Sequence, residues 1–546
     1  MPSPLRQTVL DRLSRDPFDV LVIGGGINGA VSAAALATRG ARVALLERGD
    51  FASATSQESS NLIWGGIKYL ESYELGLVRK LCRARNQLLR AYPSSVKEVR
   101  FYTAHARDFR YGRVTLTLGA WLYWALGGFF TRGPRLLSPA RMEREEPSVA
   151  LDGVDGGFEY SDAYLPDGDA RFVWGFVRAA LDQGCAAANY VEVLGARREG
   201  ETWVAQARDR AGGRTLAIRA RVLVNACGPY ADGLNARTGI RTAHHHVLSK
   251  GIHLLVPRLA PGPRVLTFFA DDGRLFFAVP LGSTTCIGTT DTPVDDPDVT
   301  VTPEDRRFVL ANINKRLRLA RPLREEDVIA ERCGVRPLAV ERAGGIARDW
   351  MQLSRRHAID VDRAARHVTV FGGKLTDCLN VGEKICAEAI RLGVVLPDPR
   401  RRWFGEPPAA IREELLHQAE RLDLPGAGAL AERLWRRHGL HALALLEAIR
   451  RDPRAAAPAL PGTDTLRCEV ELMAEREMVV ELEDFLRRRT SIAQSIPRAA
   501  LARAPELREI ARALFGGGAD DRLAAFLENS SPYRGLPPMG SVPGNG

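Results

Sequence analysis

Hydrophobic runs and small residues alternate regularly near the start of the chain. An apolar run over residues 18–23 leads into Gly24-Gly25-Gly26, and small residues at 30–37 predict a helix directly after this turn. A second apolar run, 43–46, stops at Glu47. This order of strand, glycine turn, helix, strand and acid predicts a dinucleotide-binding βαβ unit, and therefore an α/β fold.

The glycines and the acid have separate physical roles in such a unit. Gly24 allows the tight turn, Gly26 lets the backbone approach a pyrophosphate, and Gly29 lets the helix pack closely on the strand. The helix N-terminus favours the negative charge of the phosphates. Glu47 lies roughly 20 residues downstream, where a carboxylate can accept hydrogen bonds from ribose hydroxyls. A glycine-rich turn without a ligand is the alternative interpretation.

The segment after the acid bears on which dinucleotide is bound. Residues 51–60 are rich in hydroxyl side chains, and the sequence Asn61-Leu62-Ile63-Trp64-Gly65-Gly66 follows directly. Polar residues at this place suit a cofactor that continues past its first phosphate, as FAD does. A serine-rich surface loop is the alternative for either half taken alone.

The hydrophobic pattern predicts mainly strands in the middle of the chain and helices at its end. After a predicted helix at 170–181, strand patterns and turns occupy the middle of the chain, whereas helical apolar spacing dominates beyond residue 397. The expected strands are 190–194, 203–208, 215–218, 221–225, 253–256, 265–269, 275–279 and 284–288, and the expected helices are 5–13, 303–317, 411–422, 427–438, 441–450 and 468–487.

These patterns predict a FAD-binding domain that other domains interrupt. The FAD-binding parts are expected at 1–90, 166–250 and 351–397, a membrane- or substrate-associated helical insertion at 91–165, a substrate-binding cap of antiparallel sheet at 251–350, a C-terminal helical domain at 398–529 and a disordered tail at 530–546.

Composition adds a few limits. The chain has 546 residues, so two or three domains are expected. Its eight cysteines have no metal-binding spacing, which indicates a reducing compartment, and no export signal is recognisable, so a cytoplasmic protein is expected. The net charge of +10 can reflect anionic lipid, an anionic substrate or a genome that favours arginine; no nucleic-acid module accompanies it.

One uncharged stretch, residues 114–130, is rich in aromatic side chains and is flanked by arginines. It is marginal for a membrane span, which needs about 20 apolar residues. A helix that lies in the membrane interface fits better, and a buried helix of the core is the alternative. We expect peripheral attachment to the inner face of the cytoplasmic membrane.

The ordered motifs of the chain resemble those of the FAD-dependent, quinone-linked glycerol-3-phosphate dehydrogenases. The resemblance spans most of the chain and rests on nine segments in the same order, at residues 22–29, 54–56, 65–71, 157–162, 224–229, 249–253, 287–291, 334–338 and 371–376. It implies a Rossmann-like FAD domain of the glutathione-reductase type. It also implies oxidation of sn-glycerol 3-phosphate to dihydroxyacetone phosphate, with hydride transfer to flavin N5 and electrons passed to quinone, and a homodimer is possible.

Together with the glycine motif, the resemblance assigns the cofactor site. The expected FAD-binding residues are Gly24, Gly26, Asn28, Gly29, Glu47, Thr55, Ser56, Ser60, Asn61, Leu62, Gly228, Gly373, Lys374, Leu375 and Thr376. Adjacent histidines at 244–246 alternate sides of an extended segment and make a poor ligand set, so no metal site is expected.

The substrate carries a phosphate dianion, so the pocket needs cations with directed donors. Arg336, His253 and Lys374 are the expected catalytic residues. His253 is the candidate base because an ordinary histidine pKa suits proton transfer near neutrality. Substrate binding is expected at Lys68, Tyr69, Arg336, Arg348 and Lys374. Surface ion pairs and a strand-end histidine are the alternatives for these residues taken singly.

Several departures from the family pattern lie close to the expected flavin. Asn61 and Trp64 stand where the family usually has Lys and His, Lys68 replaces an arginine, and Asp377-Cys378-Leu379 replaces Thr-Tyr-Arg. We expect FAD binding to survive these changes. The assignment of the substrate does not follow from the family pattern in the same way. The alternatives are a flavoenzyme of the same fold that acts on another hydroxyl or amine substrate, and a FAD-bound paralogue retained as a scaffold.

Overall fold

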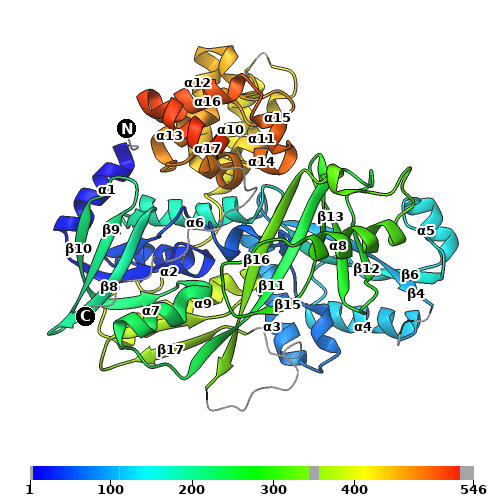
Figure 1. Ribbon diagram of the computed structural model, residues 1–546, viewed down its shortest axis with the longest axis horizontal. Coiled ribbons are helices and arrows are strands. Elements are labelled where there is room, and N and C mark those ends of the chain that lie inside the picture. Colours follow the sequence, from blue (N-terminus) through cyan, green and yellow to red (C-terminus); the bar gives the residue numbers. More distant parts are fainter. Residues whose placement is uncertain (1–3, 108, 110, 343–355, 423, 529–546) are drawn as a thin grey trace.

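The computed structural model describes residues 4–107, 109, 111–342, 356–422 and 424–528. Two sheets lie side by side, and a bundle of C-terminal helices sits against them (Figure 1). The expected tail at 530–546 lies outside the described residues.

The first sheet is the predicted dinucleotide-binding unit. Its strands follow the order β17-β18-β10-β1-β2-β7, with β9 paired to β10 and β8 paired to β9, and the central strands are parallel. The strands are β1 (Phe18–Ile23), β2 (Val43–Leu46), β7 (Ala186–Ala188), β8 (Val191–Glu199), β9 (Thr202–Asp209), β10 (Thr215–Asn225), β17 (Ala358–Asp362) and β18 (His367–Phe371). The two strands expected at 215–218 and 221–225 are one continuous strand, β10, whose first half pairs with β9 and whose second half pairs with β1.

Apolar helices cover this sheet, because central parallel strands must be buried on both faces. Helix α2, which starts after the glycine turn, packs between α6 and α9, and its small side chains are almost all buried. The helices of this part are α1 (Pro4–Arg15), α2 (Ile27–Thr38), α3 (Leu75–Ala91), α6 (Asp169–Asp182), α7 (Ala231–Thr238) and α9 (Cys378–Arg391).

The second sheet is mixed, not purely antiparallel as expected. Its order is β15-β11-β14-β13-β12-β4-β6-β3, with β16 on β11 and β5 on β6, and β12 runs parallel to β4. The strands are β3 (Leu62–Ile63), β4 (Lys97–Ala106), β5 (Arg135–Leu137), β6 (Val154–Tyr164), β11 (His244–Pro257), β12 (Val265–Phe269), β13 (Leu275–Leu281), β14 (Thr284–Gly288), β15 (Thr292–Val294) and β16 (Ala330–Glu341). Helix α8 (Pro303–Arg316) begins with a capping box at Thr302 and Asp305.

The segment 91–165 was expected to be a helical insertion, and this prediction is wrong. It contains α4 (Arg113–Leu126) and α5 (Pro139–Glu145), but also β4, β5 and β6 of the second sheet. The strands were missed because β4 and β6 are buried along most of their length and show little alternation of polar and apolar residues.

The C-terminal part is helical as expected, with one break. Residues 468–487 form no single helix: α13 ends at Arg476, and Asp484–Arg489 make a separate π-helical turn. The other helices are α10 (Ala409–Glu420), α11 (Ala427–His438), α12 (Ala442–Arg451), α13 (Arg467–Arg476), α14 (Ile492–Ser495), α15 (Arg498–Leu501), α16 (Glu506–Phe515) and α17 (Ala519–Glu528).

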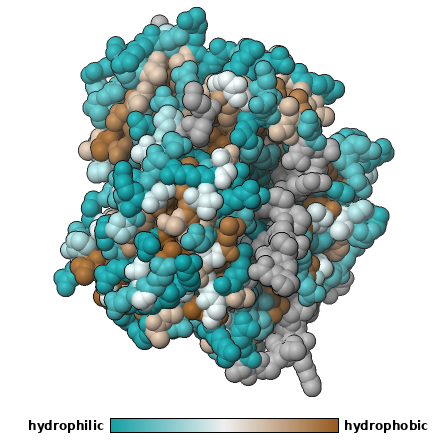
Figure 2. Space-filling model, turned by 60° about the vertical axis from the view of Figure 1, so that its left-hand side comes forward, coloured by the Kyte–Doolittle hydropathy of each residue, from teal (hydrophilic) through white to brown (hydrophobic). Residues whose placement is uncertain are grey.

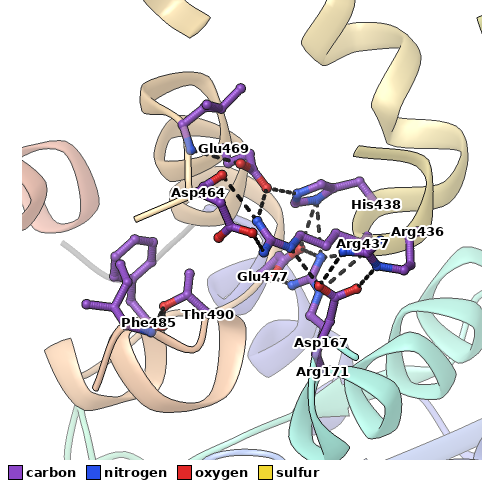
Figure 3. A network of polar contacts seen from close by, with 12 residues as sticks. Asp167, Arg171, Arg436, Arg437, His438, Asp464, Glu469, Glu477, Phe485 and Thr490 are labelled. Carbon is purple, nitrogen blue, oxygen red and sulfur yellow. Dashed lines mark hydrogen bonds and ion pairs between the residues drawn. The ribbon is translucent and has the colours of Figure 1, made fainter. Parts of the chain in front are cut away.

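Buried ion pairs join the helical domain to the FAD-binding half. Asp50 accepts hydrogen bonds from Arg488 and Arg489 at 2.7 Å, and Arg171 of α6 pairs with Glu477. Figure 3 shows the second of these groups, with guanidinium and carboxylate groups pointing toward one another. A buried pair broken on one side is strongly destabilising, so these contacts fix how the two domains meet.

The surface is mixed in character. On the face that Figure 2 shows, hydrophobic side chains are scattered among hydrophilic ones. Within the described residues, no helix combines the length and the apolar character that crossing a membrane requires.

Candidate active site

The glycine turn has room for hydrogen atoms only. Gly24 has φ +107°, and a Cβ there would lie 2.4 Å from the carbonyl oxygen of Ala226. A Cβ on Gly29 would lie 1.8 Å from the carbonyl oxygen of Gly24, so α2 can approach β1 only with glycine at this place. The two glycines therefore allow the first turn of α2 to pack closely on the backbone that follows β1.

A cavity opens in front of that helix N-terminus. Eight of the predicted cofactor residues line it, from segments far apart in the sequence: Gly24, Gly26, Asn28, Glu47, Thr55, Ser56, Gly228 and Gly373. No side chain caps α2 at Gly26, which leaves the first turn open to a ligand. The Ser56 hydroxyl accepts a hydrogen bond from the Ile27 N–H at 3.0 Å and fixes one wall.

Glu47 ends β2 at the edge of this cavity. Its carboxylate accepts hydrogen bonds from the N–H groups of Gly25 at 2.6 Å and Gly49 at 2.9 Å. Burial raises the pKa of Glu47, and these two N–H groups act against that shift. The carboxylate therefore holds the glycine turn in shape and faces the same space as the helix terminus.

Two buried polar atoms in the cavity wall have no hydrogen-bond partner among the described residues. They are Nη2 of Arg48 and Oγ of Ser53. Buried polar groups in native proteins are nearly always hydrogen-bonded, so these two atoms indicate that a further group completes the wall. Together with the open helix terminus they fit the phosphates and ribose of FAD.

Sequence reasoning missed part of the wall. Arg48, Val193, Tyr230, Arg237 and Pro337 also line the cavity, and the Arg48 guanidinium lies 3.9 Å from the centre of the Tyr230 ring. Arg48 directly follows the predicted acid, so its position was the available signal. The others come from strands and turns whose register the sequence does not fix.

The remaining predicted cofactor residues lie outside this cavity wall. Ser60 is half-buried in the loop before β3. Asn61 accepts a hydrogen bond from Arg332 at 2.8 Å, and Leu62 belongs to β3 opposite Tyr164. Leu375 packs against the core of the first sheet, and the Thr376 hydroxyl donates to the Trp64 carbonyl at 3.1 Å. Any contact of Asn61 or Thr376 with the cofactor stays a prediction.

Arg336 is positioned by the register of the second sheet. On β16 it lies opposite Ser249 of β11, and its guanidinium lies against the bare Cα of Gly251, 2.3 Å from where a Cβ would stand. It donates to the Thr289 hydroxyl at 2.8 Å and pairs with Asp291 at 3.3 Å. The side chain stays about a quarter exposed, so the guanidinium is oriented and still accessible to an anion.

His253 lies on β11 two residues after Gly251, and its cross-strand partner on β16 is Arg332. Its side chain is buried, and its Nδ1 has no hydrogen-bond partner among the described residues. Burial, with the nearby charges of Arg332 and Arg336, lowers the pKa of His253 well below its ordinary value. The imidazole is therefore neutral near neutral pH and able to accept a proton.

Lys374 is the second predicted cation, and its ammonium faces two aromatic rings. Its ammonium lies 4.3 Å from the centre of the Tyr69 ring and 5.0 Å from that of Trp64, within cation–π range. The Trp64 indole donates to the Tyr160 hydroxyl at 3.2 Å, so it is held in place. Lys68 precedes Tyr69 in the same 3₁₀ turn and is half-buried. The predicted Arg348 lies outside the described residues.

The substituted residue Asp377 brings its own counter-charges. It pairs with Lys80 of α3 at 2.6 Å and with His357 at 2.7 Å. Burial opposes ionisation of this carboxyl, but hydrogen bonds from His357, Lys80 and Asn380 lower the pKa of Asp377 overall. The negative charge that Asp377 introduces is thus neutralised locally.

Comparisons with known proteins agree with this geometry. Residues 19–373 match the family model described as FAD dependent oxidoreductase, and residues 401–521 match the C-terminal domain of alpha-glycerophosphate oxidase. The chain is 31% identical to glycerol-3-phosphate dehydrogenase 2 of Mycobacterium tuberculosis over 94% of this chain and 88% of the relative. It is 32% identical to D-erythritol 1-phosphate dehydrogenase of Brucella abortus over 86% of this chain and 94% of the relative.

A solved structure shows the same fold. The glycerol-3-phosphate dehydrogenase of Bacillus halodurans, complexed with FAD, superposes with a TM-score of 0.72 at 24% identity, over 99% of this chain and 100% of that chain. The fold and the nucleotide cavity define an FAD-dependent oxidoreductase. Within this class, the chain belongs to the glycerol-3-phosphate dehydrogenase family, and its cofactor is FAD.

Proposed function

We propose that this flavoenzyme oxidises sn-glycerol 3-phosphate to dihydroxyacetone phosphate and passes the electrons to a quinone. The observation that carries the proposal is that two adjacent strands bear an oriented guanidinium, Arg336 on β16, and a buried neutral imidazole, His253 on β11, whose pKa the charge of Arg336 lowers. Oxidation of a phosphorylated secondary alcohol needs both, a donor for the phosphate and an acceptor for the hydroxyl proton. FAD, when bound, supplies the acceptor of the hydride.

In this scheme the residues act in a fixed order. Arg336 binds the phosphate dianion, and its bonds to Thr289 and Asp291 keep the guanidinium oriented. The bound dianion offsets the positive field at His253 and raises the pKa of that imidazole toward its ordinary value. Substrate binding therefore makes His253 a better base for the hydroxyl proton. Lys374, whose ammonium lies over the Tyr69 ring, adds a compact positive charge in this scheme.

The relatives support a phosphorylated polyol as substrate. Those named above act, by their names, on glycerol 3-phosphate or D-erythritol 1-phosphate. We favour glycerol 3-phosphate because the cationic residues Arg336 and Lys374 stay in place although Asn61, Trp64 and Asp377 depart from the family pattern. D-Erythritol 1-phosphate is the competing substrate, and a non-phosphorylated alcohol or an amine is the alternative.

The test is reduction of the purified yellow holoprotein in the absence of oxygen. Glycerol 3-phosphate is expected to bleach the flavin absorbance, whereas glycerol, which lacks the phosphate, is not. Arg336→Met should lower the rate of bleaching by about 10²- to 10³-fold, in line with loss of a charge-assisted contact to a dianion, and should leave FAD bound. Arg336→Lys keeps the charge without the fork and should be intermediate.

Other outcomes of this experiment would redirect the assignment. Faster bleaching by D-erythritol 1-phosphate would replace the substrate and keep the class. Bleaching by an amine or a neutral alcohol alone would contradict the phosphate-binding role of Arg336. Inertness to all four compounds would leave the scaffold interpretation.

Helix α4 supports a peripheral contact with the membrane, where a quinone is found. Its apolar face points outward: Val114, Leu118, Trp121 and Leu122 are 57%, 64%, 46% and 46% exposed, whereas Ala120 and Tyr123 are buried. The helix packs on α3 at one edge of the molecule (Figure 1). An outward apolar face with arginines near its ends fits a helix that lies in the membrane interface.

Flotation with vesicles of anionic phospholipid tests this part of the proposal. The wild-type protein should float with the vesicles, and Leu118→Glu should remain in solution while it keeps full reduction by glycerol 3-phosphate. Leu527→Glu, at a comparably exposed leucine of α17, is the control and should float. Equal flotation of all three proteins would exclude α4 as the contact.

A further inference from the structure

A second cavity lies where the C-terminal helical domain meets α6, away from the nucleotide. Its volume is about 360 Å³, within the range of about 300–1,000 Å³ that small-molecule sites occupy. Its wall combines α6, the segment around Trp403 and the end of α11. It shares no lining residue with the nucleotide cavity.

Arg178 of α6 differs from the other arginines of this wall. Arg171 pairs with Glu477, Arg436 with Asp167, and Arg437 with Asp464, as Figure 3 shows for these labelled groups. Arg178 forms no ion pair with any described residue; its one recorded hydrogen bond runs to the Arg437 carbonyl oxygen at 3.2 Å. Among the described residues, no carboxylate therefore contacts the Arg178 guanidinium directly.

The electrostatic surroundings of Arg178 favour the binding of an anion. Burial, and then the nearby charge of Arg171, lower the pKa of Arg178 to about 10, and the more distant charges of Glu477 and Asp182 only partly oppose this shift. A half-buried guanidinium with a depressed pKa costs folding free energy, which a bound anion would recover.

The rest of the wall favours an organic anion over a bare ion. Aromatic side chains form the apolar part: Tyr92, Phe172, Phe176, Trp403 and Trp435. His441 also lines the cavity; burial and Arg178 lower its pKa, so it offers a neutral N–H donor. An apolar pocket with a few convergent polar groups is the usual form of a ligand site.

The acidic groups of the wall leave Arg178 open. Glu406 accepts from the Ser94 N–H at 2.6 Å, from the Ser94 hydroxyl at 2.9 Å and from the Trp435 indole at 3.3 Å. Asp182 is exposed at the end of α6 and makes no ion pair with a described residue. Neither carboxylate forms an ion pair with Arg178, although the charge of Asp182 acts on it from a distance.

We propose that this interdomain cavity binds a small organic acid, with its carboxylate on Arg178 and its planar apolar part against the aromatic wall. The site is separate from the active site and does not depend on the substrate assignment. Because it lies between two domains, a bound acid also strengthens their contact.

The test uses the FAD-loaded protein and three probes. Benzoate carries both the charge and the ring, sulfate carries the charge alone, and benzamide carries the ring alone. Calorimetric titration should give the tightest binding for benzoate and at least ten-fold weaker binding for benzamide. A rise of the unfolding temperature with benzoate should follow the same order.

Variants assign the site. Arg178→Gln should weaken benzoate binding more than ten-fold, whereas Arg83→Gln, an exposed arginine of α3, should leave it unchanged. Arg336→Met, in the active site, should also leave it unchanged. Without any anion, Arg178→Gln should unfold at the same or a higher temperature than the wild type, because it removes an uncompensated cation.

A second variant blocks the cavity and keeps the charge. Gly175 of α6 lines the cavity, and a Cβ there meets nothing within 4 Å. Gly175→Leu should therefore exclude benzoate with Arg178 intact, while Gly175→Ala should still bind it. Loss of binding in Arg336→Met but not in Arg178→Gln would place the acid in the active site and overturn the proposal, as would failure of all three probes to bind.

Discussion

The nucleotide cavity and the proposed substrate site are built by different means. At the nucleotide cavity the backbone itself forms the site, because Gly24 and Gly29 leave no space for any Cβ. At the proposed substrate site, side chains from segments far apart in the sequence are placed on two adjacent strands, as Arg336 and His253 are. A backbone site tolerates few substitutions, whereas a side-chain site can change its substrate while the cofactor stays bound. The departures at Trp64 and Asp377 are absent from the wall of the nucleotide cavity, which agrees with this difference.

The largest effect is expected at Gly29. Gly29→Val should yield protein without FAD, or no folded protein, because a Cβ would stand 1.8 Å from the Gly24 carbonyl oxygen and must push α2 off β1. The ratio of the flavin-band absorbance to the protein-band absorbance of the purified protein measures the FAD content. Gly233→Ala in α7 is the matched control: a Cβ there meets nothing within 4 Å, and Ala stabilises a helix by about 0.5–1 kcal/mol relative to Gly. Full FAD content in Gly29→Val would contradict the backbone account of the site.

Asp50 connects the nucleotide side to the helical domain, and its loss should come next in size. Asp50→Asn leaves Arg488 and Arg489 buried without this carboxylate, which should lower the free energy of unfolding by about 3–5 kcal/mol. Urea denaturation of the holoprotein measures this loss. Asp452→Asn removes an exposed pair with Arg454 and should change stability little. Equal effects of the two variants would show that the interdomain pairs contribute no more than surface pairs.

The same difference between a backbone site and a side-chain site explains which parts of the fold could be predicted from the sequence. The glycine motif and Glu47 predicted the βαβ unit because local chemistry determines a backbone site. Strands β12, β13 and β14 were predicted from short apolar runs between turns. The family resemblance, which the comparisons confirm, gave the cofactor.

The parts that were not predicted depend on contacts distant in the sequence. The break between α13 and the π-helical turn follows from buried partners such as Asp50 and Glu477, which the helical spacing of 468–487 does not reveal. The contact of Arg332 with Asn61 requires β16 to lie next to the loop before β3. The pairing of Asp377 with Lys80 and His357 likewise depends on tertiary structure alone.

A buried histidine of the nucleotide half offers a smaller effect with a defined pH dependence. Burial lowers the pKa of His367 on β18 from 6.5 to about 4. The unfolded chain therefore binds the extra proton first, so stability from this group is present above the unfolded pKa and is lost as the pH falls toward 4. His367→Gln should remove up to about 3 kcal/mol of this acid-dependent loss. Thermal unfolding as a function of pH measures it, and parallel curves for both proteins would contradict the assignment.

The smallest effect should fall on the substrate side, at Trp64. Its ring is one of two that face the Lys374 ammonium, so Trp64→Leu should remove a cation–π contact of about 0.5–1 kcal/mol and raise the KM for the phosphorylated substrate by about two- to five-fold. FAD content should not change. Trp64→Phe keeps a ring near the ammonium and should stay close to the wild type; equal KM values for the two variants would dismiss the cation–π contact.

The sign of the change at Trp64 separates two roles for this residue. If the indole positions Lys374, removing it weakens substrate binding. If the indole instead fills space that the substrate needs, Trp64→Leu should lower the KM and speed flavin reduction, although the hydrogen bond to Tyr160 is lost in both cases. Because the Tyr160 contact anchors the ring away from solvent, we expect the first result. A gain of activity would mean that the substrate side has diverged toward a smaller or differently shaped alcohol, while the nucleotide side, fixed by its backbone, has not changed.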